Sequence, residues 1–210
     1  MDDKNQKLIL FLLGNSAVGK TSFIKRYVND ISDDNYQPTI GIDFFSKMIK
    51  LETGEYLKLL FYDTAGQERY KSISMNLIKN TDGIFLMYDV TEQRSFEEIN
   101  GWIGSIKEVK GDNFPIILIG NKCELEKRVI TKVEGEKFAK EQGFSFIETS
   151  CKEGINIEES VQVLVSKIIE NKKLKENKEE QNGNYKIRKN ENFKLLKLQK
   201  KEKNKKKCCS

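Results

Sequence analysis

The stretch Gly14-Asn15-Ser16-Ala17-Val18-Gly19-Lys20-Thr21 is the strongest indication of the fold, and it directly follows a continuous apolar run at residues 8–13. A buried strand that ends in the pattern G-x-x-x-x-G-K-[ST] is typical of a phosphate-binding loop. The glycines let several backbone N–H groups point at one anion, Lys20 adds positive charge for the β- and γ-phosphates, and the Thr21 hydroxyl can ligate Mg²⁺. The alternative is an ordinary strand–turn–helix corner, but the preceding strand and the Lys-Thr pair favour binding of a nucleoside triphosphate.

Around this loop, strand-like and helix-like stretches alternate from residue 7 to about residue 171. We predict strands at residues 8–13, 43–51, 56–62, 84–88, 116–119 and 144–148, and helices after Lys20 and at residues 95–109, 131–142 and 157–170. Several strands are continuous apolar runs, as strands buried on both faces should be. The pattern predicts an α/β fold of the P-loop NTPase class: a doubly wound, six-stranded, mostly parallel sheet with one antiparallel edge strand and helices on both faces.

Composition narrows the class of protein. The 210 residues suffice for one globular domain with some left over, and the absence of histidine excludes Ser-His-Asp catalysis, Cys-His catalysis and His-ligated zinc. Four cysteines are too few and too scattered for a disulfide framework. Because no apolar stretch approaches the length of a membrane span and the charged N-terminus is unlike a signal peptide, we expect folding in the cytosol.

Charge divides the chain into two parts. Residues 171–210 hold 15 Lys and Arg against 5 Asp and Glu, whereas residues 1–170 hold 22 against 27. The positive net charge therefore belongs to the tail, which gives nucleic-acid binding by the whole protein little support. Since the tail has little to bury, we expect a domain at residues 1–170 and a basic, disordered tail at residues 171–210.

A second motif, Asp63-Thr64-Ala65-Gly66-Gln67-Glu68-Arg69, follows the strand predicted at residues 56–62. Phosphoryl hydrolysis needs a phosphate cradle, a metal ion at the β- and γ-phosphates and a positioned water. An Asp at a strand end can hold the Mg²⁺ shell, Gly66 can present its N–H to the γ-phosphate, and Gln67 can orient the water. A D-x-x-G turn alone is common, but this one lies a strand pair downstream of a phosphate loop.

With these motifs the chain resembles the Ras-like small GTPases, and within them the Rab family, over roughly residues 7–170 and at the C-terminal cysteines. The segments that carry the resemblance are residues 38–44, 63–73, 88–91, 121–124 and 148–152. The resemblance implies a GTPase that cycles between GTP-bound active and GDP-bound inactive states and regulates intracellular vesicle trafficking. It also implies that Gln67 is the catalytic residue and that slow intrinsic hydrolysis depends on an activating partner, worth about 10³–10⁵ in rate.

The resemblance assigns the other site residues by position. It places the phosphates against Gly14, Asn15, Ser16, Ala17, Val18, Gly19, Lys20, Thr21, Ser22, Tyr36, Thr39 and Gly66. It gives Mg²⁺ the ligands Thr21, Thr39 and Asp63, and places guanine against Asn121, Lys122, Glu124, Ser150, Cys151 and Lys152. In this scheme Asn121 ties the base loop to the phosphate loop, Lys122 lies along the base plane, and the Cys151 N–H meets the guanine oxygen. Effectors would read Ile40, Gly41, Ile42, Asp43, Phe44 and Tyr70. These residues lie within a first switch segment (residues 30–44) and a second switch segment (residues 63–78), which GTP orders and hydrolysis releases.

The chain departs from the family pattern mainly around the base. Glu124 stands where the family has an Asp whose carboxylate accepts two hydrogens from guanine and so excludes adenine. The extra methylene of Glu has to fold away, so guanine affinity can drop by about 1.5–3 kcal/mol, the size of one hydrogen bond to a charged group. Ser32 stands where an aromatic residue commonly stacks on the base. We expect guanine specificity with weaker binding and faster nucleotide exchange; the alternative is that neighbouring shifts compensate fully.

The tail ends Lys205-Lys206-Lys207-Cys208-Cys209-Ser210. By resemblance to Rab termini both cysteines would be geranylgeranylated, and two lipid chains suffice for stable membrane anchoring, helped by the lysines at anionic lipid. The alternative is two unmodified thiols, because Cys-Cys-Ser is one residue short of a C-a-a-X box. The expected location is the cytosolic face of an intracellular membrane, with cycling through the cytosol.

The implied partners are an exchange factor, a GTPase-activating protein, a GDP-dissociation inhibitor, prenylation escort machinery and effectors, all acting on a monomer that binds no nucleic acid. A second hypothesis is a nucleotide-gated, membrane-bound binding protein with negligible hydrolysis or relaxed base specificity, for which Glu124 and Ser32 leave room. A third, a small-molecule kinase, would need an acceptor site and usually a lid of arginines, and neither is evident in the sequence.

Overall fold

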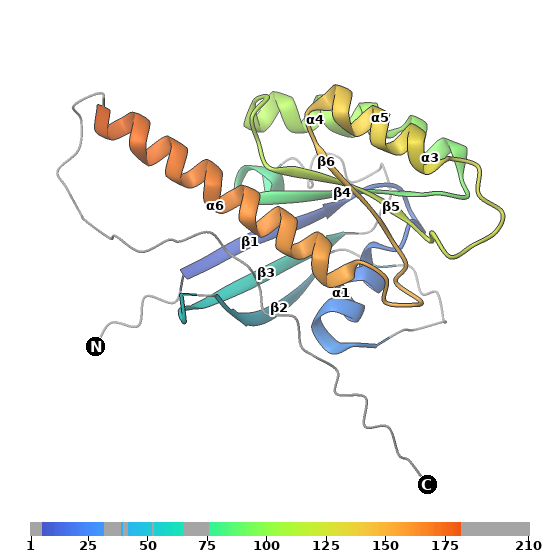
Figure 1. Cartoon of the computed structure of the whole chain (residues 1–210), viewed down its shortest axis with the longest axis horizontal. Coiled ribbons are helices and arrows are strands. Elements are labelled where there is room, and N and C mark those ends of the chain that lie inside the picture. The colour runs from blue at the N-terminus through green and yellow to red at the C-terminus, as the bar shows by residue number, and fades with distance from the viewer. Residues whose placement is uncertain (1–5, 32–38, 40–41, 52, 65–75, 182–210) are drawn as a thin grey trace, which may run out of the picture.

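The structure is a computed structural model, and it describes residues 6–31, 39, 42–51, 53–64 and 76–181. In chain order the elements are β1 (Gln6–Leu13), α1 (Lys20–Asn29), β2 (Ile42–Lys50), β3 (Tyr56–Thr64), β4 (Gly83–Asp89), α3 (Gln93–Glu97), α4 (Ile99–Lys110), β5 (Ile116–Asn121), α5 (Lys132–Gln142), β6 (Ser145–Thr149) and α6 (Ile157–Gln181). Six strands form one sheet in the order β2-β3-β1-β4-β5-β6, with helices on both faces (Figure 1).

The sheet is mostly parallel. β1 pairs in parallel with β3 and β4, β5 pairs in parallel with β4 and β6, and β2 pairs antiparallel with β3 at one edge. The doubly wound fold expected from the sequence is therefore confirmed. β2 and β3 lie on one side of β1, and β4, β5 and β6 lie on the other, so the strand order reverses at β1. Open α/β sheets bind ligands at such a point, at the carboxyl ends of their strands.

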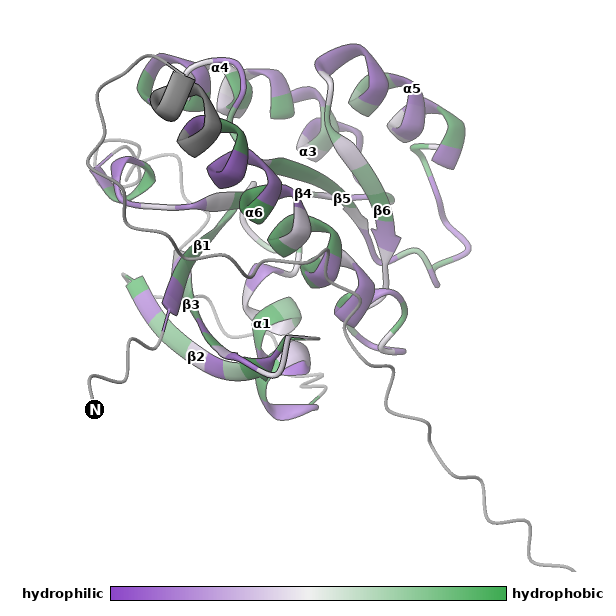
Figure 2. Ribbon diagram, turned by 60° about the vertical axis from the view of Figure 1, so that its left-hand side comes forward, coloured by the Kyte–Doolittle hydropathy of each residue, from purple (hydrophilic) through white to green (hydrophobic). Residues whose placement is uncertain are grey.

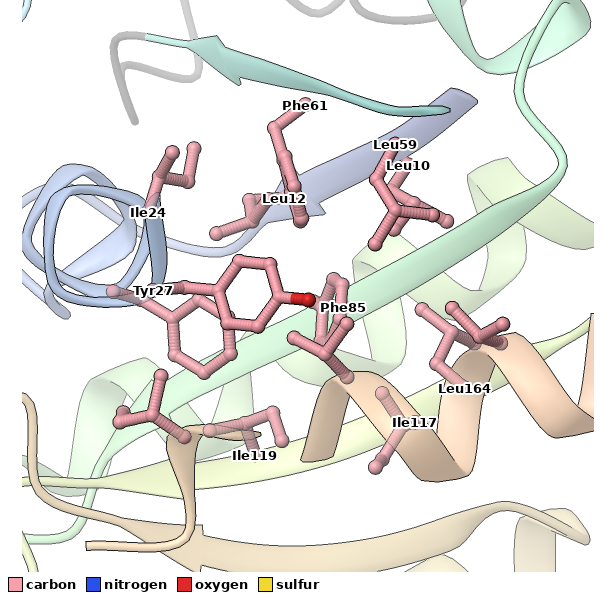
Figure 3. Close-up of a cluster of buried hydrophobic side chains, with 14 of the residues drawn as sticks. Leu10, Leu12, Ile24, Tyr27, Leu59, Phe61, Phe85, Ile117, Ile119 and Leu164 are labelled. Atoms are coloured by element: carbon pink, nitrogen blue, oxygen red, sulfur yellow. The ribbon is translucent and has the colours of Figure 1, made fainter. Parts of the chain in front are cut away.

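Two clusters of buried side chains lie on opposite faces of the sheet. In β1, Leu10 and Leu12 belong to the first core cluster, which α1 and α6 cover, whereas Phe11 and Leu13 belong to the second, which α4 and α5 cover. Figure 3 shows part of the first core cluster, where Tyr27 of α1 and Leu164 of α6 pack around the strand residues. Burial on both faces explains why β1, β4 and β5 are continuous apolar runs in the sequence.

Each long helix buries one side and exposes the other. Figure 2 shows hydrophobic residues interleaved with hydrophilic ones along α4, α5 and α6, as expected for helices packed on a sheet. α6 buries the predicted stripe Ile157, Val161, Leu164, Val165 and Ile168. None of the helices in the described part of the chain is both long and apolar enough to cross a membrane.

The single helix predicted at residues 95–109 is wrong, because two helices, α3 and α4, occupy this stretch. α3 is tied to the end of β4 by Ser95, whose Oγ accepts a hydrogen bond from the Asp89 N–H at 3.0 Å and donates to the Glu92 carbonyl at 2.8 Å. The buried side chains of α4 instead pack into the second core cluster. The helix therefore breaks at Glu98, between these two attachments.

The expectation of disorder from residue 171 onward is wrong for residues 171–181, because α6 continues to Gln181. The Asn171 side chain donates to the Asn113 carbonyl at 3.0 Å, and the Lys172 Nζ lies 2.7 Å from Asp82 Oδ1. Lys and Glu are good helix formers, so these two contacts prolong a helix that has little more to bury. The boundary at residue 170 stays a prediction, and the rest of the tail lies outside the described residues.

Candidate nucleotide-binding site

The phosphate loop (residues 14–21) joins β1 to α1 and depends on its two glycines. Gly14 has a φ of 142° and Gly19 a φ of 103°, a region that favours glycine. A Cβ would lie 2.2 Å from the Met87 carbonyl oxygen at Gly14 and 2.3 Å from Asn121 Nδ2 at Gly19. No side chain fits at either position, so the backbone can approach its neighbours as closely as an anion cradle requires.

Lys20 is the first residue of α1, and its side chain turns back over the phosphate loop. Its Nζ donates to the carbonyl oxygens of Gly14 at 2.8 Å and Asn15 at 2.6 Å. Burial lowers the pKa of Lys20 to about 8, and the charge of Asp63 opposes that shift. The loop thus holds a buried amine next to the N-terminus of α1, where an anion is favoured.

Three oxygen-bearing side chains meet beside Lys20. The Thr21 hydroxyl donates to Asp63 Oδ2 at 2.5 Å, and the hydroxyls of Thr21 and Thr39 lie 2.8 Å apart. Burial raises the pKa of Asp63, although the Thr21 hydrogen bond and the charge of Lys20 act against this. Among the described residues Asp63 Oδ1 is buried without a hydrogen-bond partner. These hard oxygen donors fit Mg²⁺, which prefers such ligands.

Asn121, at the end of β5, joins a second loop to the phosphate loop. Its Nδ2 donates to the Val18 carbonyl at 2.8 Å, and its Oδ1 accepts from the Thr149 hydroxyl at 3.0 Å and the Cys151 thiol at 3.3 Å. Burial raises the pKa of Cys151 to about 12, so its thiol stays protonated and can donate. We call residues 121–124 and 149–152, which Asn121 ties together, the base loops.

Further contacts fix the base loops. The Lys122 Nζ lies 2.6 Å from Asp89 Oδ2, and Arg26 of α1 donates to the carbonyls of Cys151, at 2.8 Å, and Lys152. Glu124 is half-buried, and its Oε2 is buried without a partner among the described residues. A buried acceptor that lacks a partner is costly unless a ligand completes it. Glu124 therefore fits a role in binding the N–H groups of a base.

The other predicted residues are placed as follows. Ser16, Ala17 and Lys152 are exposed, Ser22 is half-buried, and the buried Ser150 accepts a hydrogen bond through Oγ from the Glu153 N–H at 3.0 Å. Ile42, Asp43 and Phe44 begin β2, where the exposed Phe44 ring meets Tyr62 edge-on with centroids 5.0 Å apart. Outside the described residues lie Ser32, Tyr36, Ile40, Gly41, Gly66, Gln67, Tyr70, Cys208 and Cys209.

Sequence reasoning missed Arg26, Asp89 and Thr149 as parts of this site. Asp89 and Thr149 stand inside segments that carry the resemblance, and both are buried polar residues. That combination could have signalled a structural role. Arg26 gave no such signal, because its two acceptors lie 125 and 126 residues further along the chain.

Comparisons with known proteins agree with this geometry. A model described as the Ras family matches residues 7–170. Ras-related protein Rab-13 of Mesocricetus auratus is 42% identical over 161 residues, which are 76% of this chain and 79% of the relative. Ras-related protein Rab-3D of Homo sapiens is 43% identical over 162 residues (77% and 74%), and Ras-related protein Rab-10 of Diplobatis ommata is 41% identical over 168 residues (80% and 84%). A family match across the whole nucleotide-binding domain, with this identity to several Rab proteins, shows that the chain belongs to the Ras family and is a Rab-type small GTPase.

Proposed function

We propose that this GTPase is a switch in intracellular vesicle trafficking, active with GTP and inactive with GDP. The observation that carries the proposal is the position of Thr39, whose hydroxyl lies 2.8 Å from that of Thr21 and 3.5 Å from Asp63 Oδ2. Thr39 belongs to the first switch segment, whereas Thr21 belongs to the phosphate loop. A segment that depends on such contacts can be held or released by the phosphates.

The residues around the phosphates would have two roles, phosphate contact and Mg²⁺ binding. Lys20 would contact the β- and γ-phosphates, and Thr21, Thr39 and Asp63 would hold Mg²⁺. When bound, Mg²⁺ neutralises negative charge on the phosphates. The support for this set is its chemistry: two hydroxyls and a carboxylate lie within 3.5 Å, and one buried carboxylate oxygen lacks a partner among the described residues.

On the base side, Glu124 would accept hydrogen bonds from guanine, Lys122 would lie along the base, and Asn121 would keep the base loops on the phosphate loop. The hydrogen bonds of Asn121 and the buried Glu124 Oε2 support these roles. Gln67 would orient the attacking water beside Gly66, in a segment outside the described residues. Phe44, which is 66% exposed, would belong to the surface that effectors read, and lipids on Cys208 and Cys209 would hold the protein on an intracellular membrane.

A single-turnover assay tests this proposal against a binding protein with negligible hydrolysis. Protein loaded with labelled GTP would be followed with and without the catalytic domain of a Rab-activating protein. We expect slow intrinsic hydrolysis, an acceleration of about 10³–10⁵, and loss of most of the accelerated rate in Gln67→Leu. Gln93→Leu, at an exposed position of α3, is the matched control and should behave like the unchanged protein. No acceleration by any activating domain would favour the binding protein.

A further inference from the structure

The phosphate loop is attached to α4 through one hydrogen bond. Trp102 of α4 donates from its indole Nε1 to the side-chain oxygen of Asn15 at 3.4 Å. Both residues are buried, with 6% of Trp102 and 7% of Asn15 exposed. The two are 87 positions apart in the sequence, and Trp102 is the only tryptophan of the chain.

Asn15 also holds the lysine of the loop. Its backbone carbonyl accepts from the Lys20 Nζ at 2.6 Å, while its side chain is bound to Trp102. The place of Asn15 therefore affects the path of the loop and, together with the Gly14 carbonyl at 2.8 Å, the position of the Lys20 amine. A displacement of Trp102 would be passed to Lys20 through a single residue.

Trp102 also belongs to the second core cluster. That cluster contains Ile78, and Leu77 packs against it. Both residues stand at the end of the second switch segment, which begins at Asp63. Trp102 thus binds the phosphate loop through Asn15 and belongs to the same core cluster as Ile78 of the second switch segment, which suits a positioning residue for the nucleotide.

A buried indole N–H needs an acceptor in any core, so Asn15 could simply satisfy Trp102. Asn15, however, binds Trp102 through its side chain and Lys20 through its carbonyl, so the phosphate loop also depends on Trp102. We propose that Trp102 is a positioning residue of the phosphate loop, whose hydrogen bond to Asn15 slows nucleotide release. The inference rests on the proposed binding of guanine nucleotide at this site.

A double-mutant cycle tests the inference. Release of tritiated GDP would be measured by filter binding, which does not need tryptophan fluorescence, for the unchanged protein, Trp102→Phe, Asn15→Ala and the double variant. Phe keeps most of the packing and removes the N–H donor. We expect release about two- to tenfold faster in Trp102→Phe, the worth of one neutral hydrogen bond, and no further effect of this change in the Asn15→Ala background. Ile103→Val, in the same helix and cluster, controls for lost packing and should leave release unchanged.

The outcomes separate the inference from the proposed function. An unchanged release rate in Trp102→Phe, or the same acceleration with and without Asn15, would overturn the positioning role alone. An unchanged protein that retains no guanine nucleotide would overturn the proposed function and the inference together.

If Trp102→Phe does not fold, the indole itself provides the readout. The protein has one tryptophan, so its indole N–H gives one resonance in a ¹⁵N-labelled sample. We expect this resonance to shift on GDP release and to exchange faster with solvent in Asn15→Ala. A resonance that responds to neither change would contradict the inference.

Discussion

At the phosphate end of the site, which is the phosphate loop, the backbone conformation determines the shape of the loop. At the base end, which is the base loops, side chains hold the chain in place. The phosphate loop turns through residues with positive φ, and its two glycines sit where any Cβ would collide. The base loops contain no glycine, and although Lys122 also has a positive φ of 65°, these loops are held by the side chains of Asn121, Arg26 and Lys122. We therefore expect the phosphate end to tolerate few substitutions. The base end can accept Glu124, and substitutions at this residue should change the affinity for the nucleotide.

The largest effect is expected at the phosphate end, in Gly19→Ala. The new Cβ would lie 2.3 Å from Asn121 Nδ2, at a φ of 103°. Backbone strain of about 1–3 kcal/mol and a damaged buried hydrogen bond of about 1–3 kcal/mol should together destabilise the fold and abolish GDP retention. Denaturant unfolding and nucleotide analysis check this. Gly104→Ala, where a Cβ meets nothing within 4 Å, is the control and should be neutral or slightly stabilising. Normal GDP retention by Gly19→Ala would mean that the phosphate loop tolerates a Cβ at this position.

Asn121→Ala should weaken both ends at once. It removes the bond to the Val18 carbonyl, leaves the Thr149 hydroxyl without its acceptor, and leaves the Cys151 thiol with only the Gly19 carbonyl at 3.8 Å. We expect GDP affinity to fall by about 2 kcal/mol or more, roughly thirtyfold, in competition binding. Thr149→Val removes one of these bonds and keeps the volume, so its effect should be several times smaller. Equal effects of the two changes would argue against Asn121 as the link.

Glu124→Asp should strengthen nucleotide binding at the base loops instead of weakening it. The shorter side chain needs no folding of an extra methylene, so GDP should bind about tenfold more tightly, and ADP should not. Competition binding of the two nucleotides measures both. Glu126→Asp makes the same change at an exposed position two residues away and should have no effect. Unchanged GDP affinity in Glu124→Asp would mean that neighbouring residues already compensate for Glu124.

The smallest effect is expected from Arg26→Lys. Arg26 donates through two nitrogens to two carbonyls of the base loops, and a lysine cannot reproduce that fork. GDP release should become about two- to fivefold faster, with little change in stability. Asp30→Asn removes only the exposed ion pair of Arg26, at 3.6 Å, and should leave release unaltered. If both variants released GDP at the same rate, the carbonyl contacts would have no role.

Most strands of the sheet could be predicted from the sequence, because a strand buried on both faces appears as a local run of apolar residues. Most of β1, β4 and β5 is buried on both faces of the sheet, and the stretches at residues 8–13, 84–88 and 116–119 are therefore continuous apolar runs. The break between α3 and α4 has no such signal. Glu98 itself keeps helical dihedrals (φ −73°, ψ −10°), and the two nearby glycines, Gly101 and Gly104, lie inside α4 and not at the break.

Interactions between distant parts of the chain account for what could not be predicted. In the prolonged α6 Lys172 meets Asp82, and the phosphate loop is attached to α4 where Trp102 meets Asn15. At the site itself, the motifs identified Lys20, Thr21, Asp63 and Asn121, which the fold gathers at one edge of the sheet. Their supports, Arg26 and Asp89, come from a helix face and a strand end whose neighbours only the fold defines.

The central claim is that the base loops, with Glu124 in place of the usual Asp, still select guanine. The most direct measurement is the identity of the nucleotide that copurifies with the recombinant protein in Mg²⁺, released by denaturation, resolved by chromatography and checked by competition with GDP, ATP and XDP. The account predicts stoichiometric GDP. An empty site, or comparable binding of an adenine nucleotide, would contradict it.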